Sequence, residues 1–267
     1  MDTTSVMGLA LKMAGFKDIP ADSGIWVPGK EVRRALFCID AGTPELLLAK
    51  ELGYDLLIAH HPVGPARLTF PEVVKRHLGF MLEKGVPKKV AEEATNLLVE
   101  RVDVRSHPTN YLQDIQAAKR LKMPFMNIHL PIDQITRDIL LEEISHSRAE
   151  TVGDLVASLG MMPEFKKAKT RIEVRMGRKE NRLGNWVLLF AAGTNGGYPV
   201  AKAYFEHGLD TVIYLHIDHE ELTRLRKDCI GNLVILGHMA GDSVGINAFL
   251  RSLEKKGVEC DTLGVVR

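Results

Sequence analysis

The strongest constraint on the fold is an alternation of strand-like and helix-like segments near the N-terminus. Residues Ala35 to Ile39 are all apolar, as in a strand that is buried on both faces. A helix is predicted to begin at Thr43-Pro44, because threonine is a good N-cap and proline suits the first helical position, and to end near Gly53. A second strand, Asp55 to Ala59, completes a βαβ unit. This unit predicts a parallel sheet and therefore an α/β protein.

The rest of the chain continues this alternation. Residues 71–122 are rich in charged residues and leucine and predict about three helices, separated at Pro87 and Pro108. Further strands are predicted at 124–129, 171–176, 186–192, 211–215, 233–236 and 262–266, and further helices at 134–146, 151–159, 199–207, 218–227 and 243–255. We expect two α/β halves: an N-terminal lobe, 1–133, with a helical insertion at about 68–123, a connecting segment, 134–185, and a C-terminal lobe, 186–267.

Charge and cysteine content exclude several classes of protein. The net charge is +1 at pH 7 and no run of Lys or Arg resembles a basic arm, so nucleic acid is not an expected partner. The three cysteines, Cys38, Cys229 and Cys260, form no CxxC pair, which excludes zinc-ribbon and thioredoxin-like motifs and agrees with reduced thiols. The first residues lack a signal-peptide pattern, and no apolar stretch approaches a membrane span. We therefore expect a soluble, cytoplasmic protein without membrane contact.

Four histidines lie at the ends of predicted strands: His60, His61, His129 and His238. The carboxyl ends of neighbouring strands meet at one edge of a parallel or mixed sheet, and α/β proteins build their ligand sites at that edge. Two carboxylates follow a histidine by four residues, Asp133 after His129 and Asp242 after His238. Residues with this offset share one face where a helical turn begins, so each pair could bind one cation.

This set of side chains predicts a site for divalent cations. Imidazole nitrogens with carboxylate oxygens suit zinc, manganese, iron, cobalt or nickel, whereas magnesium and calcium favour all-oxygen shells. The candidate ligands are His60, His61, Asp133, His238 and Asp242, with His129 close by. The alternative is that each histidine is a hydrogen-bonded polar residue at a strand end, which is the more common role of such a residue taken singly.

A glycine-rich turn and a second polar group are weaker candidates. The turn lies between a predicted strand and helix, where backbone N–H groups could bind a phosphate, and comprises Gly193, Thr194, Asn195, Gly196 and Gly197. It lacks the Walker A and dinucleotide-binding signatures, so a tight turn that requires glycine is at least as good an interpretation. His216 and His219 follow the strand at 211–215 and are candidate proton carriers. The remaining histidines are expected at the surface: His77, His107, His146 and His207.

Several of these segments resemble motifs of the NIF-three-like family, some members of which carry the label GTP cyclohydrolase I type 2 homologue. Asp55 to Pro62 (DLLIAHHP) is similar to the family's D-L-I-I-S-H-H-P segment, and the preceding strand, which ends in Asp40, is similar to its early strand. His129 to Asp133 (HLPID) resembles H-T-N-L-D, Gly193 to Gly197 resembles a G-S-G-G turn, and Gly237 to Asp242 (GHMAGD) resembles G-H-x-x-x-E. The order of these motifs agrees from about residue 35 to the end.

The resemblance implies a fold, a site and an assembly. It implies two related α/β lobes that face each other with two metal ions between them, and toroidal hexamers of the whole chain. It implies five metal ligands, namely His60, His61, Asp133, His238 and Asp242. Three departures are notable: Asp242 replaces the family's Glu, Leu130-Pro131 replaces Thr-Asn, and Leu215-His216 replaces a Gly-Asp pair, although His219 matches the family's histidine.

These observations favour a metal-dependent hydrolase. A pair of metal ions lowers the pKa of a water nucleophile, and His129 or His219 is the candidate acid–base residue. The glycine-rich turn points weakly to a nucleotide or phosphoester-type small molecule; the GTP cyclohydrolase activity follows from the family label alone, since no residue pattern here predicts recognition of a purine ring. The alternatives are a ring-forming scaffold or regulatory interaction protein with a structural or regulatory metal centre, and a metal chaperone. A structural metal site is closed by protein ligands, whereas a catalytic one keeps an open position.

Overall fold

The computed structural model describes residues 1–267, and its internal contacts divide the chain into two compact units. The first unit comprises residues 1–73, 103–135 and 242–265, and the second comprises 74–102, 136–241 and 266–267. Each unit is therefore discontinuous in sequence, which differs from the expected contiguous lobes 1–133 and 186–267. The physical reason is strand pairing: the last strand of the chain pairs with an N-terminal strand and so belongs to the first unit.

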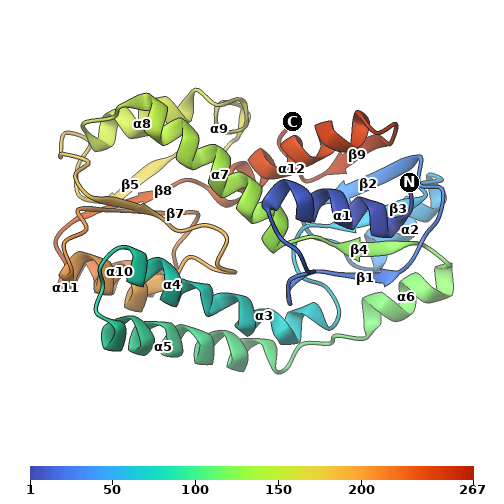
Figure 1. The fold of residues 1–267 in the computed structure, drawn as a ribbon, viewed down its shortest axis with the longest axis horizontal. Helices are drawn as coiled ribbons and strands as arrows, with labels where there is room; N and C mark the ends of the chain where they lie inside the picture. Colours follow the sequence, from blue (N-terminus) through green and yellow to red (C-terminus); the bar gives the residue numbers. More distant parts are fainter. The chain divides into compact units, whose positions relative to one another are not determined.

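A five-stranded sheet forms the centre of the first unit (Figure 1). Its order is β1-β4-β3-β2-β9, with bounds Gly24–Val27 (β1), Phe125–Asn127 (β4), Leu56–Ala59 (β3), Arg34–Cys38 (β2) and Glu259–Leu263 (β9). Neighbouring strands are parallel except for β1, which lies antiparallel at the edge beside β4. The parallel β2–β3 pair confirms the predicted βαβ unit. Together with the parallel β3–β4 pair, it brings the carboxyl ends of β2, β3 and β4 to one edge of the sheet.

Apolar side chains cover both faces of this sheet. On one face, α2 (Thr43–Glu51) and α6 (Gln113–Leu121) bury Leu46 and Ala118 against Leu57 and other strand residues. On the other face, the ring of Phe37 in β2 meets the ring of Phe249 edge-on, with a centroid separation of 6.3 Å. Phe249 belongs to α12 (His238–Glu254), most of which lies in this unit, and the unit also contains α1 (Thr3–Ala14) and nearly all of α3 (Ala66–Val74). Burial of large apolar side chains of this kind contributes roughly 1.5–3 kcal/mol each.

The second unit repeats the plan of the first, with parallel strands and one antiparallel edge strand. Its four-stranded sheet has the order β5-β8-β7-β6, with bounds Glu173–Met176 (β5), Asn232–Ile235 (β8), Thr211–Tyr214 (β7) and Trp186–Leu188 (β6). The β6–β7 and β7–β8 pairs are parallel, and β5 is antiparallel to β8. Two α/β units with related sheets confirm the predicted fold class.

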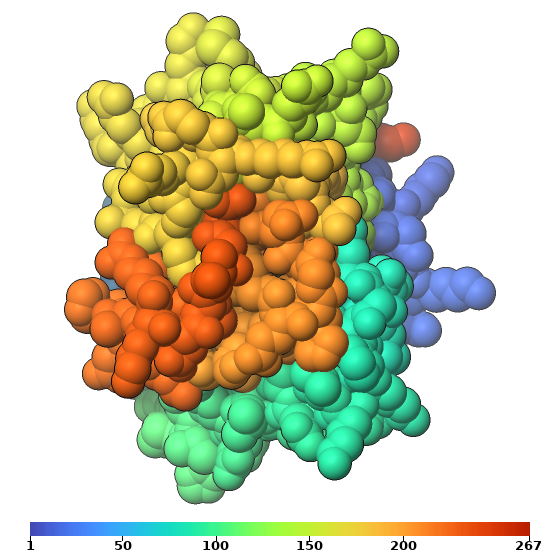
Figure 2. Space-filling view, turned by 90° about the vertical axis from the view of Figure 1, so that its left-hand side faces the viewer, coloured from blue at the N-terminus to red at the C-terminus, as the bar shows by residue number.

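Helices cover both faces of the second sheet (Figure 1). One face carries α10 (Gly197–Glu206) and α11 (His219–Asp228), and α4 (Arg76–Glu83) and most of α5 (Lys88–Ser106) share their apolar core. Figure 2 shows the α4–α5 segment and the α10–α11 segment side by side at the surface of this unit, in teal to green and in orange. The other face carries α7 (Leu130–Ser147), α8 (Val152–Gly160) and α9 (Pro163–Lys167).

The helical segment expected at about 68–123 contains more helices than predicted. Four helices, α3 to α6, lie within residues 66–121, because α3 and α4 are separate although only Lys75 intervenes. Residues 74–102 pack into the core of the second unit, so this part of the segment is not an appendage of the N-terminal lobe. None of the helices combines the length and the apolar character that crossing a bilayer requires.

Candidate metal centre

His60 and His61 follow β3 directly and keep its backbone pairing with the end of β2. The amide of His60 donates to the carbonyl of Cys38 (2.8 Å), and the amide of His61 donates to the carbonyl of Ile39 (3.0 Å). This pairing holds the two histidines at the carboxyl edge of the sheet, as the strand pattern predicted. The side chain of His60 is 1% exposed and that of His61 is 24% exposed.

His129 and Asp133 lie where β4 turns into α7. The helix begins at Leu130, and the amide of Asp133 donates to the carbonyl of His129 (3.0 Å), which is the first helical hydrogen bond. This early start places the two side chains one turn apart on one face, as their spacing predicted. Both residues are 6% exposed.

Asp242 lies in α12, which begins at His238 and therefore five residues before the predicted start at 243. The side chain of Asp242 is 1% exposed. One of its oxygens, Oδ2, lies 3.4 Å from Nε2 of His61 and 3.8 Å from Nε2 of His60. Asp242 thus joins His60, His61, His129 and Asp133 within the first unit.

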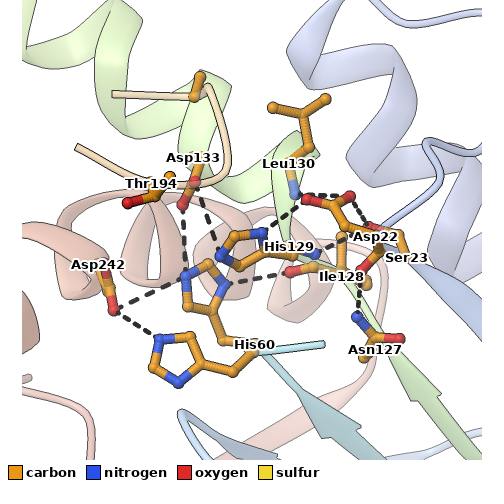
Figure 3. Close-up of polar contacts among 12 residues, drawn as sticks. Asp22, Ser23, His60, Asn127, Ile128, His129, Leu130, Asp133, Thr194 and Asp242 are labelled. Carbon is orange, nitrogen blue, oxygen red and sulfur yellow. Dashed lines mark hydrogen bonds and ion pairs between the residues drawn. The ribbon is translucent and has the colours of Figure 1, made fainter. Parts of the chain in front are cut away.

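These five side chains form one cluster, which we call the histidine–aspartate cluster. The ring centroid of His60 is 5.2 Å from that of His61 and 5.0 Å from that of His129, and the centroids of His61 and His129 are 5.9 Å apart. Oδ1 of Asp133 lies 3.4 Å from Nε2 of His60, and its Oδ2 lies 3.8 Å from Nε2 of His129 (Figure 3). Three imidazole rings and two buried carboxylates therefore converge on one point of the sheet edge.

All three histidines use their rings in the same way. Nδ1 of each ring lies within hydrogen-bond distance of an oxygen: the carbonyl of Ile128 for His60 (3.2 Å), Asp40 for His61 (2.7 Å) and Asp22 for His129 (2.7 Å). An oxygen partner at Nδ1 assigns the proton to Nδ1. Nε2 of each ring faces Asp133 or Asp242 and is the nitrogen left to bind a metal ion. Histidines that bind metals through Nε2 show this arrangement, with the other N–H donated to a carboxylate or carbonyl.

Nε2 of His60 is buried and has no hydrogen-bond partner. The nearest charged atoms are the oxygens of Asp133 and Asp242, at 3.4 and 3.8 Å. A lone pair that faces two carboxylates in a buried site is unfavourable unless a proton or a cation lies between them. The cluster therefore has the donor set and the geometry of a cation site.

The carboxylates also control the protonation of the rings. Burial lowers the pKa of His61, but the hydrogen bonds and charges of Asp242 and Asp40 outweigh it and raise the pKa to about 10. Burial likewise lowers the pKa of His129, and the charges of Asp133 and Asp22 outweigh it and raise the pKa above its usual value. Without a cation, protons on these rings balance the carboxylates, so a metal ion that binds here competes with protons.

Two overlapping groups of three residues could each hold a metal ion. The first group is His60, His61 and Asp242, and the second is His60, His129 and Asp133; within each group the potential ligand atoms lie within 4.8 Å of one another. Mixed nitrogen and oxygen donors suit zinc, manganese, iron, cobalt or nickel. Three protein ligands leave a coordination position open, which is a property of catalytic rather than structural metal sites.

The other predicted residues lie in the second unit. His238 is the first residue of α12, and its ring lies 4.8 Å from that of His216. His219 is the first residue of α11 and is exposed. Their roles as a metal ligand and as a proton carrier stay predictions. His77, which was expected at the surface, is 0% exposed, because α4 packs against the core of this unit.

The glycine-rich turn is held by the chain's own side chains. Nε2 of His77 bonds to the carbonyl of Thr194 (2.8 Å), and Oδ1 of Asn195 accepts the amide of Leu215 (2.9 Å). The carboxylate of Glu221 accepts the amide of Tyr198 in the first turn of α10 (3.2 Å). These bonds explain the turn without a ligand, since an internal carboxylate already lies at the helix N-terminus. Phosphate binding stays a prediction for its four candidate residues, which are Gly193, Thr194, Gly196 and Gly197.

Replacing Gly197 with alanine is expected to destabilise the protein by about 1–3 kcal/mol. Gly197 has a φ of +58°, which side chains rarely adopt, and an added Cβ would lie 2.4 Å from Oε1 of Glu221. The matched control is Gly79→Ala, because Gly79 lies inside α4 with nothing within 4 Å of an added Cβ. That change is expected to stabilise the protein by about 0.5–1 kcal/mol. Urea unfolding of both variants checks the prediction, and equal effects of the same sign would contradict it.

Sequence analysis missed Asp22, and it gave Asp40 no role. Asp22 lies before β1 and reaches His129 across 107 residues of sequence. Asp40 follows β2 and bonds to His61, although its side chain is 85% exposed. The motif around Asp40 offered a signal, since a carboxylate after a neighbouring strand lies at the same sheet edge. No local pattern around Asp22 predicts its contact with His129.

Comparison with known proteins gives matches among solved structures. No family model matches the sequence, and no curated protein matches it. The structure is similar to a NIF3 superfamily protein from Sphaerobacter thermophilus, with 42% identity, a TM-score of 0.96, and coverage of 99% of this chain and 98% of that one. Two further structures share the fold: reduced HcgD from Methanocaldococcus jannaschii (13% identity, TM-score 0.63) and a protein from Thermus thermophilus (15% identity, TM-score 0.58), each over 98% of both chains.

Proposed function

This chain belongs to the NIF3 superfamily, and on that premise we propose that it binds two divalent metal ions and uses them to hydrolyse a nucleotide or phosphoester-type substrate. The observation that carries the proposal is the buried Nε2 of His60, which has no hydrogen-bond partner and faces two aspartates. A structural histidine in a core would have both nitrogens satisfied. A metal ligand needs one free lone pair, and His60 has one.

The proposed ligands are His60, His61, Asp133, His238 and Asp242. The lone pair at Nε2 of His60 serves one ion only, although both groups of potential ligands include this residue. Two ions therefore need a further ligand, and the family resemblance supplies His238, which precedes Asp242 by one turn of α12. The carboxylates of Asp133 and Asp242 each offer two oxygens, so either one can serve two ions.

The chemistry of the site follows from the roles of these side chains. Divalent ions, when bound, polarise a phosphoryl oxygen and lower the pKa of a water nucleophile. Asp22 and the carbonyl of Ile128 orient the rings of His129 and His60 by accepting hydrogen bonds from their Nδ1 atoms, and the exposed Asp40 bonds to Nδ1 of His61. His219, which is exposed at the start of α11, is the proposed proton carrier.

Metal analysis together with an activity screen tests this proposal. The purified protein is stripped with a chelator and reconstituted in turn with zinc, manganese, iron, cobalt and nickel, and the metal content per chain is counted. We expect about two ions per chain, as in two-metal hydrolases, and turnover of a chromogenic phosphodiester or of nucleotides only in the reconstituted protein. Full activity in the metal-free protein would contradict the proposal.

The open coordination positions distinguish this function from that of a scaffold with a structural metal. The three histidines and the four carboxylate oxygens of the proposed set offer at most seven ligand atoms for two ions, one fewer than two closed four-coordinate sites need. Assembly into a hexamer, which the family resemblance implies, belongs to the proposal. Sedimentation of the metal-free and reconstituted protein tests whether the assembly forms and whether it requires metal.

A further inference from the structure

Asp22 is a fully buried carboxylate whose Oδ2 lies 2.7 Å from Nδ1 of His129. Its other oxygen, Oδ1, accepts the hydroxyl of Ser23 (3.2 Å) and the amide of Leu130 (3.4 Å). Figure 3 shows this carboxylate beside the ring of His129, on the side away from Asp133. The carboxylate therefore accepts all of these hydrogen bonds, and one of the donors is the ring N–H of His129.

The position of Asp22 is fixed from several directions. Its carbonyl accepts the side-chain amide of Asn127 (2.7 Å), and the carbonyl oxygen of that side chain accepts the indole N–H of Trp26 (3.0 Å). The hydroxyl of Ser23 also accepts the amide of His129 (2.9 Å). The β1 and β4 strands therefore hold Asp22 and His129 in one rigid arrangement, since Trp26 lies in β1 and Asn127 in β4.

We propose that Asp22 is a positioning residue that makes His129 a metal ligand. Asp22 accepts a hydrogen bond from Nδ1 of His129 and thereby keeps a proton on that nitrogen. Nε2 is then the nitrogen that can bind a metal ion, beside Asp133 and next to His60. Carboxylates that bond to a metal-binding histidine, rather than to the metal itself, fix the tautomer and the orientation of its ring in this way. The inference rests on the proposed metal centre and gives His129 the role of a ligand of the His60–His129–Asp133 group, in place of the proton carrier expected from sequence.

The exposure of Asp22 sets it apart from Asp40. Both carboxylates lie 2.7 Å from Nδ1 of a histidine in the cluster, but the side chain of Asp22 is 0% exposed and that of Asp40 is 85% exposed. Water can replace Asp40 as the acceptor for His61, whereas Asp22 and its contact with Nδ1 of His129 are buried. Asp22→Asn and Asp40→Asn are therefore a matched pair of variants.

Asp22→Asn disturbs His129 in either orientation of the new amide. If its NH2 group faces His129, it donates to Nδ1, which moves the ring proton to Nε2 and removes the lone pair that binds metal. If its oxygen faces His129, the NH2 group faces the amide of Leu130, so that two donors oppose each other. Both orientations lower the affinity of His129 for a metal ion, although the imidazole ring stays in place.

The test is metal affinity, measured with Co²⁺ and Zn²⁺ against a chromophoric chelator. We expect Asp22→Asn to weaken binding by about 10–100-fold, the usual cost of losing such a partner, and Asp40→Asn by less than about fivefold, as for exposed charge pairs. Circular dichroism confirms that each variant is folded. If the wild type binds no metal, the proposed function fails; if it binds metal and both variants bind within fivefold of it, the function stands and the role of Asp22 is overturned.

A spectroscopic measurement on the wild type keeps the inference testable if Asp22→Asn does not fold. In the Co²⁺ protein, a ligating histidine gives a strongly shifted, exchangeable ring N–H proton signal. We expect one such signal to disappear in His129→Ala, and in folded Asp22→Asn to shift and exchange faster with water. If His129→Ala loses none of these signals, His129 is not a ligand and the inference is overturned.

Discussion

Replacing His60 with alanine is expected to abolish most metal binding, with a loss of affinity greater than about 100-fold. Losing a residue that only bonds to a metal ligand costs about 10–100-fold, and the loss of a ligand itself costs more. His60 belongs to both potential ligand groups, so its removal leaves neither group with more than two ligands. Titration against a chromophoric chelator and metal counting per chain measure the effect. The apolar replacement also leaves Asp133 and Asp242 without the nitrogen that faces both of them.

The matched control is His107→Ala. His107 is exposed, lies just beyond the end of α5 and belongs to neither ligand group. Its replacement is expected to leave metal affinity unchanged. In the metal-free state, His60→Ala loses the hydrogen bond between Nδ1 and the carbonyl of Ile128, the packing of the ring, and the close approach of Nε2 to Asp133 and Asp242. Its unfolding free energy is therefore expected to fall by about 1–3 kcal/mol. A folded His60→Ala protein that binds metal within threefold of the wild type would show that the cluster is not the metal site.

The sequence predicted the strand-end histidines because their positions follow from local rules. His60 and His61 follow an apolar run that forms β3, and parallel pairing with β2 and β4 brings such strand ends together. The i, i+4 spacing of His129 and Asp133 predicted a shared face, and α7 begins early enough to provide it. Each inference uses the local pattern of one segment together with the general rule that parallel strands end at the same edge of a sheet, which is why both could be made from the chain alone.

The parts that could not be predicted depend on contacts between distant residues. Asp22 reaches His129 only because β1, a short strand with no clear apolar alternation, pairs antiparallel with β4. The division into units depends on the pairing of β9 with β2, which returns residues 242–265 to the first unit. The charged neighbours of His77 predict a position at the surface, yet α4 turns its side chain inward. In each case tertiary pairing decides the environment of a residue whose neighbours in sequence are uninformative.

The buried His77 is expected to make the second unit sensitive to acid. Burial lowers the pKa of His77 to about 4, whereas an unfolded histidine has a pKa near 6.5. Between these values the unfolded chain binds a proton that the folded chain does not, so the free energy of unfolding falls as the pH falls from 6.5 towards 4. A difference of this size corresponds to about 3 kcal/mol. Above pH 6.5 both states are neutral at this position, and the full stability is present.

The variant His77→Gln isolates this contribution. Glutamine cannot titrate, but its NH2 group can still donate to the carbonyl of Thr194, the partner of Nε2 of His77. In a Trp26→Phe background, Trp186 in β6 is the one remaining tryptophan, and its fluorescence reports on the unit that contains His77. Urea unfolding at pH 7 and at steps down to pH 4 should give similar stabilities at pH 7 and an additional loss of about 3 kcal/mol in the histidine protein at pH 4. Parallel pH curves for the two proteins would mean that His77 accepts a proton while buried, and that its environment is more polar than the packing of α4 indicates.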